Sequence, residues 1–518
     1  MNRAGWTASW QTVTSAARWR GFAGALLLAA AVRGYLLWQY YCITWDGVEY
    51  IRAAKKFFTG NVSAGLQSVY PPGYPLLIAA AHPLIGDWEL AGQCVSIVCG
   101  ILLLLPLYWI FNQMFDRKIA LLACYLAAIN PFLALYSVHV RSESPYLLLS
   151  TTAFYLLFIA IERRAMARFF AAGLIAGYAF LIRPEAIGFL LIVPGVLLLR
   201  WWCWREQSGV ALLQPVGALT VGFVIFALPY IAYLSVDTGR IGAISRKAGV
   251  TLAINLQESG LLDAEGHGRE SDVSEFVFTD YVLRHPLSYL KKVTSDLPAA
   301  VWTFFQALYY SYLPFLLLGL FVALRKDFFQ RSHLLLAGFV LFYVFGFALI
   351  LVKRRYALQA VPLSLAWVAL GMVCLWDWLR ARLSFQTAKL TLALIALLFV
   401  ASTLARTLKP VSREKAFVRQ AGWYLKGRNL NGDLAVAAFD ERPAFYAAAR
   451  SILLSPQMDP GNLSGFLRDQ KADYFAAESK TFAKFLPAVS RQPESYGLVL
   501  EEQFVGTRND RMLVFKVN

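Results

Sequence analysis

Charged residues are scarce in this 518-residue chain, which contains 16% Asp, Glu, Lys and Arg against 58% hydrophobic residues. A soluble protein carries about a quarter charged residues, so this composition, with a mean hydropathy of +0.52, excludes a wholly soluble protein. Apolar runs long enough to cross a bilayer recur from residue 20 to residue 404 and then stop. We therefore predict a polytopic α-helical membrane protein with a small, soluble C-terminal α/β domain.

Cysteine is also rare, and the six cysteines lie in or beside apolar runs without the spacing of a zinc site or redox motif. The glycines are scattered and form no loop that would cradle a phosphate. We expect no disulfide framework, no metal and no cofactor. The net charge of +17 is carried mainly by short loops between apolar runs, which favours membrane lipids over a nucleic acid as partners.

The apolar runs predict about eleven transmembrane helices. No small-residue cleavage site follows the first run, so it is expected to be retained as a span. Residues 74–85 are apolar but short and interrupted by Pro83, and we expect them to be interfacial or re-entrant. The predicted spans are residues 20–40, 90–112, 118–135, 145–161, 169–182, 186–204, 211–235, 300–323, 333–352, 357–378 and 389–404.

The distribution of Lys and Arg predicts the orientation of these spans. With the N-terminus in the cytoplasm, basic loops such as residues 162–168 and 325–331 fall on the cytoplasmic side. The loops at about 41–89 and 236–298 then face the other side of what we expect to be a bacterial inner membrane. Within the second loop, Lys291 and Lys292 are expected to lie on a solvated amphipathic stretch. We divide the chain into a transmembrane catalytic domain, residues 1–405, and an extracytoplasmic domain, residues 406–518.

The extracytoplasmic domain alternates segments with helical and strand periodicity. The predicted helices are residues 413–426 and 443–449. The predicted strands are residues 434–439 and 473–477, followed by a β pair at 497–504 and 512–517.

Two acids stand at the outer ends of spans. Asp46 follows the first span, and Glu143 precedes the fourth. A carboxylate at the membrane–water boundary can act as a base toward a substrate that is half in lipid. The alternatives are structural: Asp46 caps the helix that begins near Gly47, and Glu143 caps the next helix or pairs with Arg141. A lone interfacial histidine such as His139 is more often structural than catalytic.

Cations gather on the same side, against the usual preference for the cytoplasm. The cluster Lys353-Arg354-Arg355 lies between two late spans, with Tyr356 at the same level. A phosphate partner would explain cations in this position. The alternative is that they snorkel at a span end. Arg183 either joins the same basin or pairs with Glu185 to hold a short turn.

Together, these motifs resemble the GT-C glycosyltransferases. The chain has D-x-x-x-Y from Asp46 to Tyr50, then YPPGYPLL from Tyr70, and R-R-Y at residues 354–356. The resemblance is nearest to the bacterial branch related to protein O-mannosyltransferases and aminoarabinose (lipid A) transferases, and it extends over residues 20–405. Many members have Asp-Glu at the first acid, where this chain has Asp46-Gly47, and many have Asp in place of Glu143.

The resemblance implies an inverting hexosyl- or pentosyltransferase that moves a sugar from a polyprenyl-phosphate donor to an envelope lipid, glycan or protein. Its catalytic residues would be Asp46, as general base, and Glu143 in support. Displacing a lipid phosphate builds positive charge on the sugar and negative charge on the phosphate, and the outer loops supply groups of both signs. The expected substrate-binding residues are Glu49, Tyr50, Tyr70, His139, Arg141, Arg183, Lys353, Arg354, Arg355 and Tyr356.

Other functions are compatible with parts of this pattern. A flippase or transporter would also use basic residues and broken segments, but transporters usually place paired ionisable residues near the bilayer midplane and show internal repeats. A glycan ligase or polymerase would use a diphosphate donor. A scaffold without catalysis would bind a partner through its outer domain.

Overall fold

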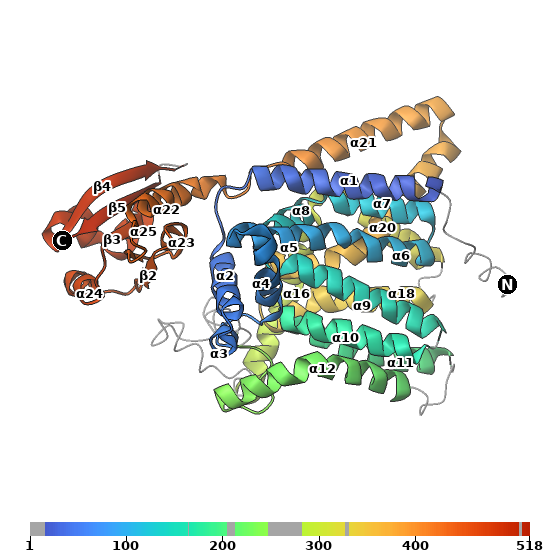
Figure 1. Cartoon of the computed structure of the whole chain (residues 1–518). Coiled ribbons are helices and arrows are strands. Elements are labelled where there is room, and N and C mark those ends of the chain that lie inside the picture. Colours follow the sequence, from blue (N-terminus) through green and yellow to red (C-terminus); the bar gives the residue numbers. More distant parts are fainter. Residues whose placement is uncertain (1–15, 164, 205–212, 247–281, 327–330, 507–509) are drawn as a thin grey trace.

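Most of the chain folds into helices that lie side by side in a bundle (Figure 1). The computed structural model describes residues 16–163, 165–204, 213–246, 282–326, 331–506 and 510–518. The main helices of the bundle are α1 (Ala16–Trp38), α5 (Trp88–Leu102), α6 (Leu104–Met114), α7 (Arg117–Ile129), α8 (Pro131–Val138), α9 (Glu143–Arg163), α10 (Met166–Ile182), α11 (Phe189–Trp204), α12 (Leu213–Thr238), α16 (Pro286–Leu308), α17 (Leu313–Lys326), α18 (Arg331–Phe345), α20 (Val361–Arg382) and α21 (Phe385–Thr407).

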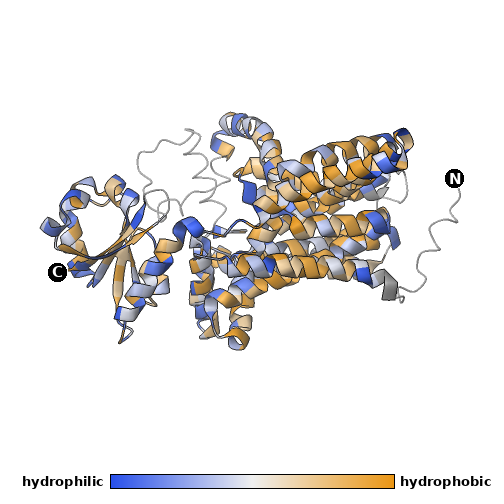
Figure 2. Cartoon of the chain, turned by 90° about the horizontal axis from the view of Figure 1, so that it is seen from above, coloured by the Kyte–Doolittle hydropathy of each residue, from blue (hydrophilic) through white to orange (hydrophobic). Residues whose placement is uncertain are grey.

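Seven helices in the described residues are long and apolar enough to cross a membrane, or nine if each of two bent pairs counts as one span. Two shorter apolar helices, Met166–Ile182 and His333–Leu349, coincide with predicted spans. The expected count of eleven therefore stays a prediction, whereas the polytopic helical architecture is confirmed. Figure 2 shows the hydrophobic residues concentrated in the bundle and the hydrophilic ones at its ends and in the C-terminal part.

Two of the predicted spans are broken. The chain bends by 55° between α7 and α8, where Asn130 caps α8 and Pro131 occupies its first turn. A second bend of 93° separates α16 from the following helix, at Tyr309, whose φ is +79°. The predicted span over residues 300–323 therefore falls on a bent pair of helices, because α16 begins at Pro286 and the chain turns sharply before α17.

The two breaks are in contact, and side chains of each form hydrogen bonds with backbone carbonyls of the other. The Asn130 side chain donates to the Leu308 carbonyl (3.0 Å), and the Tyr312 hydroxyl donates to the Leu126 carbonyl (3.0 Å). The buried Arg33 guanidinium donates to the Ala128 carbonyl (3.3 Å). Non-helical backbone inside a bilayer is tolerated only where protein groups replace the missing hydrogen bonds, and this pair of breaks meets that requirement.

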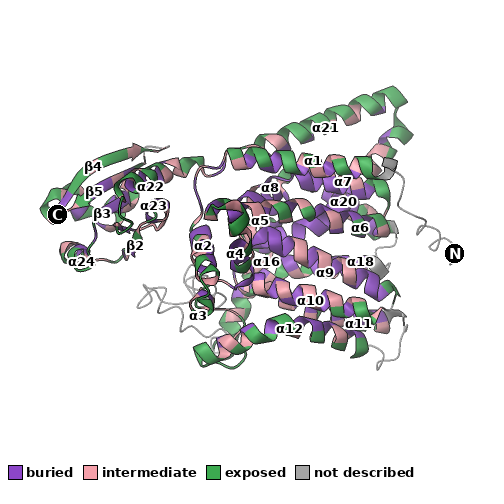
Figure 3. Ribbon diagram, viewed as in Figure 1, coloured by how far each residue is buried: buried purple, intermediate pink, exposed green. Residues whose placement is uncertain are grey.

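Burial is concentrated in the centre of the bundle. Figure 3 shows buried residues on the inner faces of the central helices, whereas α21 is largely exposed. Close helix crossings depend on glycine: a Cβ on Gly319 of α17 would lie 1.8 Å from the Trp367 carbonyl oxygen of α20, and one on Gly371 would lie 2.0 Å from that of Phe315. Small residues at crossings are typical of helices that pack within lipid.

Three further helices follow α1 and lie at the end of the bundle that faces the C-terminal part (Figure 1). They are α2 (Trp45–Phe58), α3 (Val62–Leu66) and α4 (Gly73–Ile85). The buried face of α2 includes Tyr50 and Ile51. The thirteen residues of α4 are too few for a full span, and its start lies so close to α10 that a Cβ on Gly73 would be 2.7 Å from the Leu181 carbonyl oxygen.

The C-terminal part contains a five-stranded sheet of order β2-β1-β3-β5-β4. Strand β1 pairs in parallel with β2 and β3, whereas β5 pairs antiparallel with β3 and β4. Strand β2 was not predicted from the sequence, because its four residues follow a helix without a clear alternation. The elements are α22 (Ala416–Arg428), β1 (Ala435–Ala438), α23 (Arg442–Tyr446), β2 (Arg450–Leu453), α24 (Leu463–Asp469), β3 (Tyr474–Glu478), α25 (Ser479–Phe485), α26 (Pro487–Arg491), β4 (Leu498–Val505) and β5 (Arg511–Val517).

Candidate active site

Asp46 lies in the first turn of α2, directly after the loop that leaves α1. The hydroxyl of Thr44 caps this helix by accepting a hydrogen bond from the Gly47 amide (3.2 Å). The interpretation of Asp46 as the helix cap was therefore wrong. Because Thr44 satisfies the end of the helix, the Asp46 carboxylate is available for other partners.

Three side chains from three different segments surround that carboxylate. Arg355 places a guanidinium nitrogen 2.6 Å from Oδ2, and Arg141 places one 3.5 Å from the same oxygen. The Tyr70 hydroxyl donates to Oδ1 at 2.5 Å. The Asp46 side chain keeps 20% of its surface exposed. One carboxylate thus faces two cations and remains open to solvent.

The charge of Asp46 shifts the pKa of its neighbours. Burial and the nearby Asp46 carboxylate raise the pKa of Tyr70 well above its usual range, so this phenol stays protonated and acts as a donor. Burial alone would lower the pKa of Arg141, but the carboxylates of Asp46 and Glu143 outweigh it and raise that pKa. Both neighbours therefore hold the protonation states that stabilise an anion at this position.

The second acid, Glu143, begins α9 and is buried. Its partner is Arg183, at 3.3 Å, and not Arg141 as one interpretation of the sequence proposed. Arg183 also pairs with Glu185 at 3.0 Å. The predicted pair with Glu185 is therefore confirmed, and Arg183 also contacts the second acid. Its membership of a phosphate-binding basin stays a prediction.

Two tyrosines connect the two acids. The Tyr356 hydroxyl accepts a hydrogen bond from Arg355 (3.0 Å), and its ring lies 5.4 Å from the Arg183 guanidinium. Tyr50 donates to Ser142, the residue before Glu143, at 3.0 Å, and its ring centroid is 4.3 Å from that of Tyr70. Asp46 and Glu143 thus belong to one continuous polar cluster, although they come from different loops.

The other predicted site residues lie outside this cluster. Glu49 pairs with Arg52 (2.5 Å), which pairs in turn with Glu441 of the C-terminal part (2.5 Å). His139 lies 3.3 Å from the Tyr40 hydroxyl, and burial lowers its pKa to about 3, so its ring is neutral.

Of the three consecutive cations, Lys353 and Arg354 are exposed. Arg354 lies over the Phe132 ring at 4.3 Å, and Arg406 lies 5.5 Å from the same ring. Only Arg355 of the three contacts Asp46 in the described hydrogen bonds.

Lys292 stabilises the segment that leads from α18 to Arg355. Its ammonium donates to the carbonyls of Ala348 (2.8 Å) and Ile350 (3.0 Å), just after α18 ends. Lys292 is only 3% exposed, so the expectation of a solvated stretch was wrong for this residue. The sequence did contain a signal, since Asp296 follows at i+4 and pairs with Lys292 at 3.2 Å.

The cluster is suited to bind an anion beside a base. Arginine binds carboxylate and phosphate oxygens through the same planar set of donors, so a phosphate can compete with Asp46 for Arg355. Among the residues that the structure describes, no three His, Cys, Asp or Glu side chains come together as metal ligands. The chemistry that these residues offer is proton transfer to a carboxylate and stabilisation of negative charge by guanidinium groups.

Solved structures share this architecture over nearly the whole chain. ArnT from Cupriavidus metallidurans in the apo state aligns with a TM-score of 0.57 at 12% identity, over 96% of this chain and 98% of that one. The same protein bound to undecaprenyl phosphate aligns with a TM-score of 0.55 at 13% identity, over 97% and 98%. The fold is that of the GT-C glycosyltransferases.

Two further comparisons fit this GT-C fold. The oligosaccharyltransferase AglB from Archaeoglobus fulgidus, in complex with an inhibitory peptide and a dolichol-phosphate, aligns with a TM-score of 0.55 at 14% identity, over 96% of this chain and 74% of that one. A family model described as dolichyl-phosphate-mannose-protein mannosyltransferase matches residues 69–233. This range includes Tyr70, Glu143 and Arg183 but not Asp46 or Arg355. No curated protein matches the chain in sequence.

Proposed function

We propose that this GT-C protein is a glycosyltransferase that uses a sugar linked to a polyprenyl phosphate and has Asp46 as its general base. The observation that carries the proposal is the contact between Asp46 and Arg355, two residues 309 positions apart in sequence. One segment supplies the base and the other supplies the cation that a leaving phosphate requires. AglB in complex with a dolichol-phosphate and ArnT bound to undecaprenyl phosphate share this fold, which agrees with such a donor.

The reaction follows from this geometry in a single displacement. The donor phosphate takes Arg355 and Arg141 as partners and thereby releases the Asp46 carboxylate. Asp46 accepts the proton of the acceptor hydroxyl while the hydroxyl oxygen forms a bond to the anomeric carbon. The bond from that carbon to the phosphate oxygen breaks, and its electron pair leaves with the lipid phosphate. The attack from the opposite face inverts the anomeric centre of the hexose or pentose.

Glu143 and Arg183 support this centre without contacting Asp46 directly. Their ion pair is buried, and it holds Tyr356 through the Arg183 guanidinium. Because Tyr356 also bonds to Arg355, the pair sets the position of the arginine that would bind phosphate. We therefore assign Glu143 and Arg183 as positioning residues.

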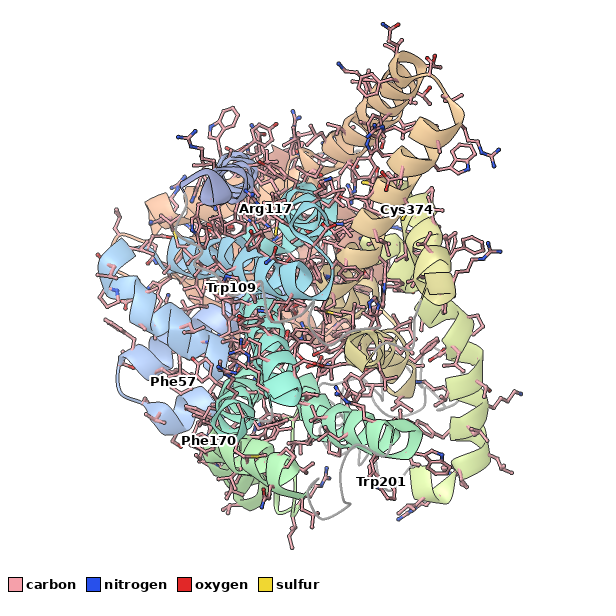
Figure 4. All side chains as sticks on the ribbon, turned by 90° about the vertical axis from the view of Figure 1, so that its right-hand side faces the viewer. Phe57, Trp109, Arg117, Phe170, Trp201 and Cys374 are labelled. Carbon is pink, nitrogen blue, oxygen red and sulfur yellow. The ribbon has the colours of Figure 1, made fainter. Side chains whose placement is uncertain are left out.

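The orientation is also part of the proposal. Asp46 lies at the end of the bundle that faces the C-terminal sheet, whereas α1 begins at the opposite end (Figure 1). Basic residues mark that opposite end, including Arg117 in Figure 4, which views the bundle from that side. By the positive-inside rule this end is cytoplasmic, so Asp46, the C-terminal domain and the envelope acceptor lie on the extracytoplasmic side.

The test is a transfer assay with the full chain in lipid nanodiscs. The donors are radiolabelled polyprenyl-phosphate hexoses and pentoses, and the acceptor is an envelope extract. We expect label transfer by the native chain and by Asp469→Asn, an exposed control with the same acid-to-amide change, but not by Asp46→Asn. Undiminished transfer by Asp46→Asn would disprove the base assignment. In a parallel reaction with a polyprenyl-diphosphate sugar, transfer from that donor alone would instead identify a ligase. Lipid movement across proteoliposomes without transfer would identify a flippase.

A further inference from the structure

A cavity of about 520 Å³ lies between the bundle and the C-terminal domain, apart from the Asp46 cluster. Its walls come from the end of α1, from α2, from the start of α5, and from α22 and α23. They include Lys55, Trp88, Gln93, Arg419, Trp423 and Tyr446.

Two buried donors in the cavity wall have no partner among the described residues. Gln93 is 4% exposed, and its Nε2 makes no hydrogen bond. The Nε of Arg419 is also unbonded, although the other nitrogens of this guanidinium bond to the Tyr40 carbonyl (3.1 Å) and to Glu89 (2.7 Å). A buried donor without a partner costs free energy. Both nitrogens are themselves covered by protein atoms, but Gln93 lines the cavity, so a ligand with hydroxyl groups could form hydrogen bonds to its amide.

The other walls are aromatic. The cavity is lined by the rings of Trp88, Trp423, Phe445 and Tyr446. Trp88 is fixed in place by stacking on His82, with 3.6 Å between the ring centroids. Rigid rings beside a few polar groups form a pocket that takes a ligand with an apolar face and hydrogen-bonding edges.

The charges in the cavity distinguish between possible ligands. Arg419, the cation that is most firmly built into the wall, is already neutralised by Glu89 at 2.7 Å. The Lys55 ammonium lies about equally far from the rings of Trp88 (5.9 Å) and Phe445 (6.0 Å), and burial lowers its pKa. Lys426 and Asp87 also line the cavity, so its wall carries both cations and carboxylates. A phosphate headgroup would face Asp87 and Glu89 as well as the cations, whereas a saccharide offers hydroxyl groups to Gln93 and carbon–hydrogen faces to the rings.

We propose that this cavity is a second saccharide-binding site, which holds a sugar residue of the acceptor away from the position that is glycosylated. This inference rests on the proposed transferase function and narrows the acceptor to one that carries a glycan. The Tyr446 hydroxyl in the cavity wall accepts a hydrogen bond from the Ile43 amide (2.7 Å), three residues before Asp46. A sugar bound here therefore lies against the segment that positions the base.

The test measures saccharide binding directly, without catalysis. The full chain in nanodiscs is mixed with free hexoses, hexosamines, hexuronic acids and their disaccharides, and binding is followed by saturation-transfer NMR. We expect at least one of these classes to bind. Gln93→Leu removes the amide that lines the cavity, so it should weaken binding by about tenfold without lowering the thermal unfolding midpoint. Gln457→Leu is the matched control, because Gln457 is exposed and remote from the cavity.

The outcomes separate this site from the proposed reaction. Asp46→Asn should bind the saccharide as the native chain does while transfer is lost. Saccharide binding that depends on Gln93 would support the site even if no donor gave transfer. The proposal is overturned if no saccharide binds, if Gln93→Leu binds as tightly as the native chain, or if glycerol 3-phosphate binds in the cavity and saccharides do not.

Discussion

Two arginine–carboxylate centres lie at the same end of the bundle, and they differ in how their charges are balanced. At the joint with the C-terminal domain, Glu89 has one oxygen on Arg419 (2.7 Å) and the other on the Tyr446 hydroxyl (3.1 Å). In the cluster at the end of α1, Asp46 faces two guanidinium groups and a phenol. The Asp46 side chain is 20% exposed, compared with 10% for Glu89.

The difference indicates what each centre does. Glu89 of the bundle accepts hydrogen bonds from one cation and one hydroxyl of the C-terminal domain, so this centre links the two parts of the chain. Asp46 has an excess of cations around it and an opening to solvent, which is the arrangement expected for a site that takes up a second anion. The same pair of residue types thus links two parts of the chain in one place and, in the function that we propose, forms the reaction centre in the other.

The largest effect should come from the same amide substitution made at both centres. Asp46→Asn removes the proton acceptor, and we expect kcat to fall by about 10²–10⁴-fold with the thermal unfolding midpoint unchanged or higher. Glu89→Gln should leave kcat per folded molecule within about threefold, because it lies outside the reaction cluster. Steady-state kinetics measures kcat for both variants. Equal losses of kcat would mean that the two centres do not differ in their role in the reaction.

A smaller effect, on donor affinity, is expected from substitution of Arg355. Arg355→Gln removes a charge-assisted bond to the donor phosphate, so the affinity for a polyprenyl-phosphate analogue should fall by about 10- to 100-fold. Arg52→Gln is the matched control, since Arg52 also pairs with carboxylates at this end of the bundle, at Glu49 and Glu441. Equilibrium binding to nanodisc-embedded protein measures both. An Arg52 variant as weak as the Arg355 variant would mean that the site does not depend on Arg355.

At the ion pair between the bundle and the C-terminal domain, the expected change is in the free energy of unfolding. Glu89→Gln keeps the shape of the side chain but loses the charge that pairs with Arg419, and we expect about 1.5 kcal/mol of destabilisation. Limited proteolysis should then cut the connection between α21 and α22 more rapidly than in the native chain. A variant with native protease resistance and native unfolding would show that the ion pair is not what fastens the C-terminal domain.

The smallest effect concerns pH. The folded chain keeps His139 neutral, with a pKa of about 3, whereas an unfolded histidine has a pKa of about 6.5. The unfolded state therefore binds more protons, and this contribution to stability is complete above pH 6.5 and is lost as the pH falls toward 3. Between pH 6.5 and 5.5 the loss is about 1 kcal/mol. Unfolding of His139→Gln should show less of this acid sensitivity; an identical pH dependence would refute it.

Much of the fold follows from the sequence, because the long apolar runs have the length that a bilayer requires and the central strands β1 and β3 are short apolar runs that are almost wholly buried. The breaks do not follow from it. Asn130 and Pro131 form a recognisable helix start, whereas the signals around Tyr309 are weaker: Ser311 is a single polar residue and Pro314 lies five residues past the bend. The carbonyl before this 93° bend accepts its hydrogen bond from a residue far away in sequence.

The sequence predicts the types of residue in the candidate site, but not which of them contact one another. Counting the predicted spans is enough to place these acids and cations at the same end of the bundle. Which of three consecutive cations contacts Asp46 depends on where α18 ends, and that position is fixed by Lys292 from another helix. Tyr70 and Arg141 likewise reach Asp46 only after α4 and α9 have packed.

The paired breaks have a consequence for how the chain is made. Asn130 emerges from the ribosome 178 residues before Leu308, its hydrogen-bond partner. At about 5–20 residues per second, this interval is on the order of 10–40 s. During that time the kinked segment lacks the groups that later complete its backbone bonds, and lipid cannot replace them. We expect α8 to enter the bilayer late, together with α16, so that membrane insertion of this protein does not follow the order of its sequence.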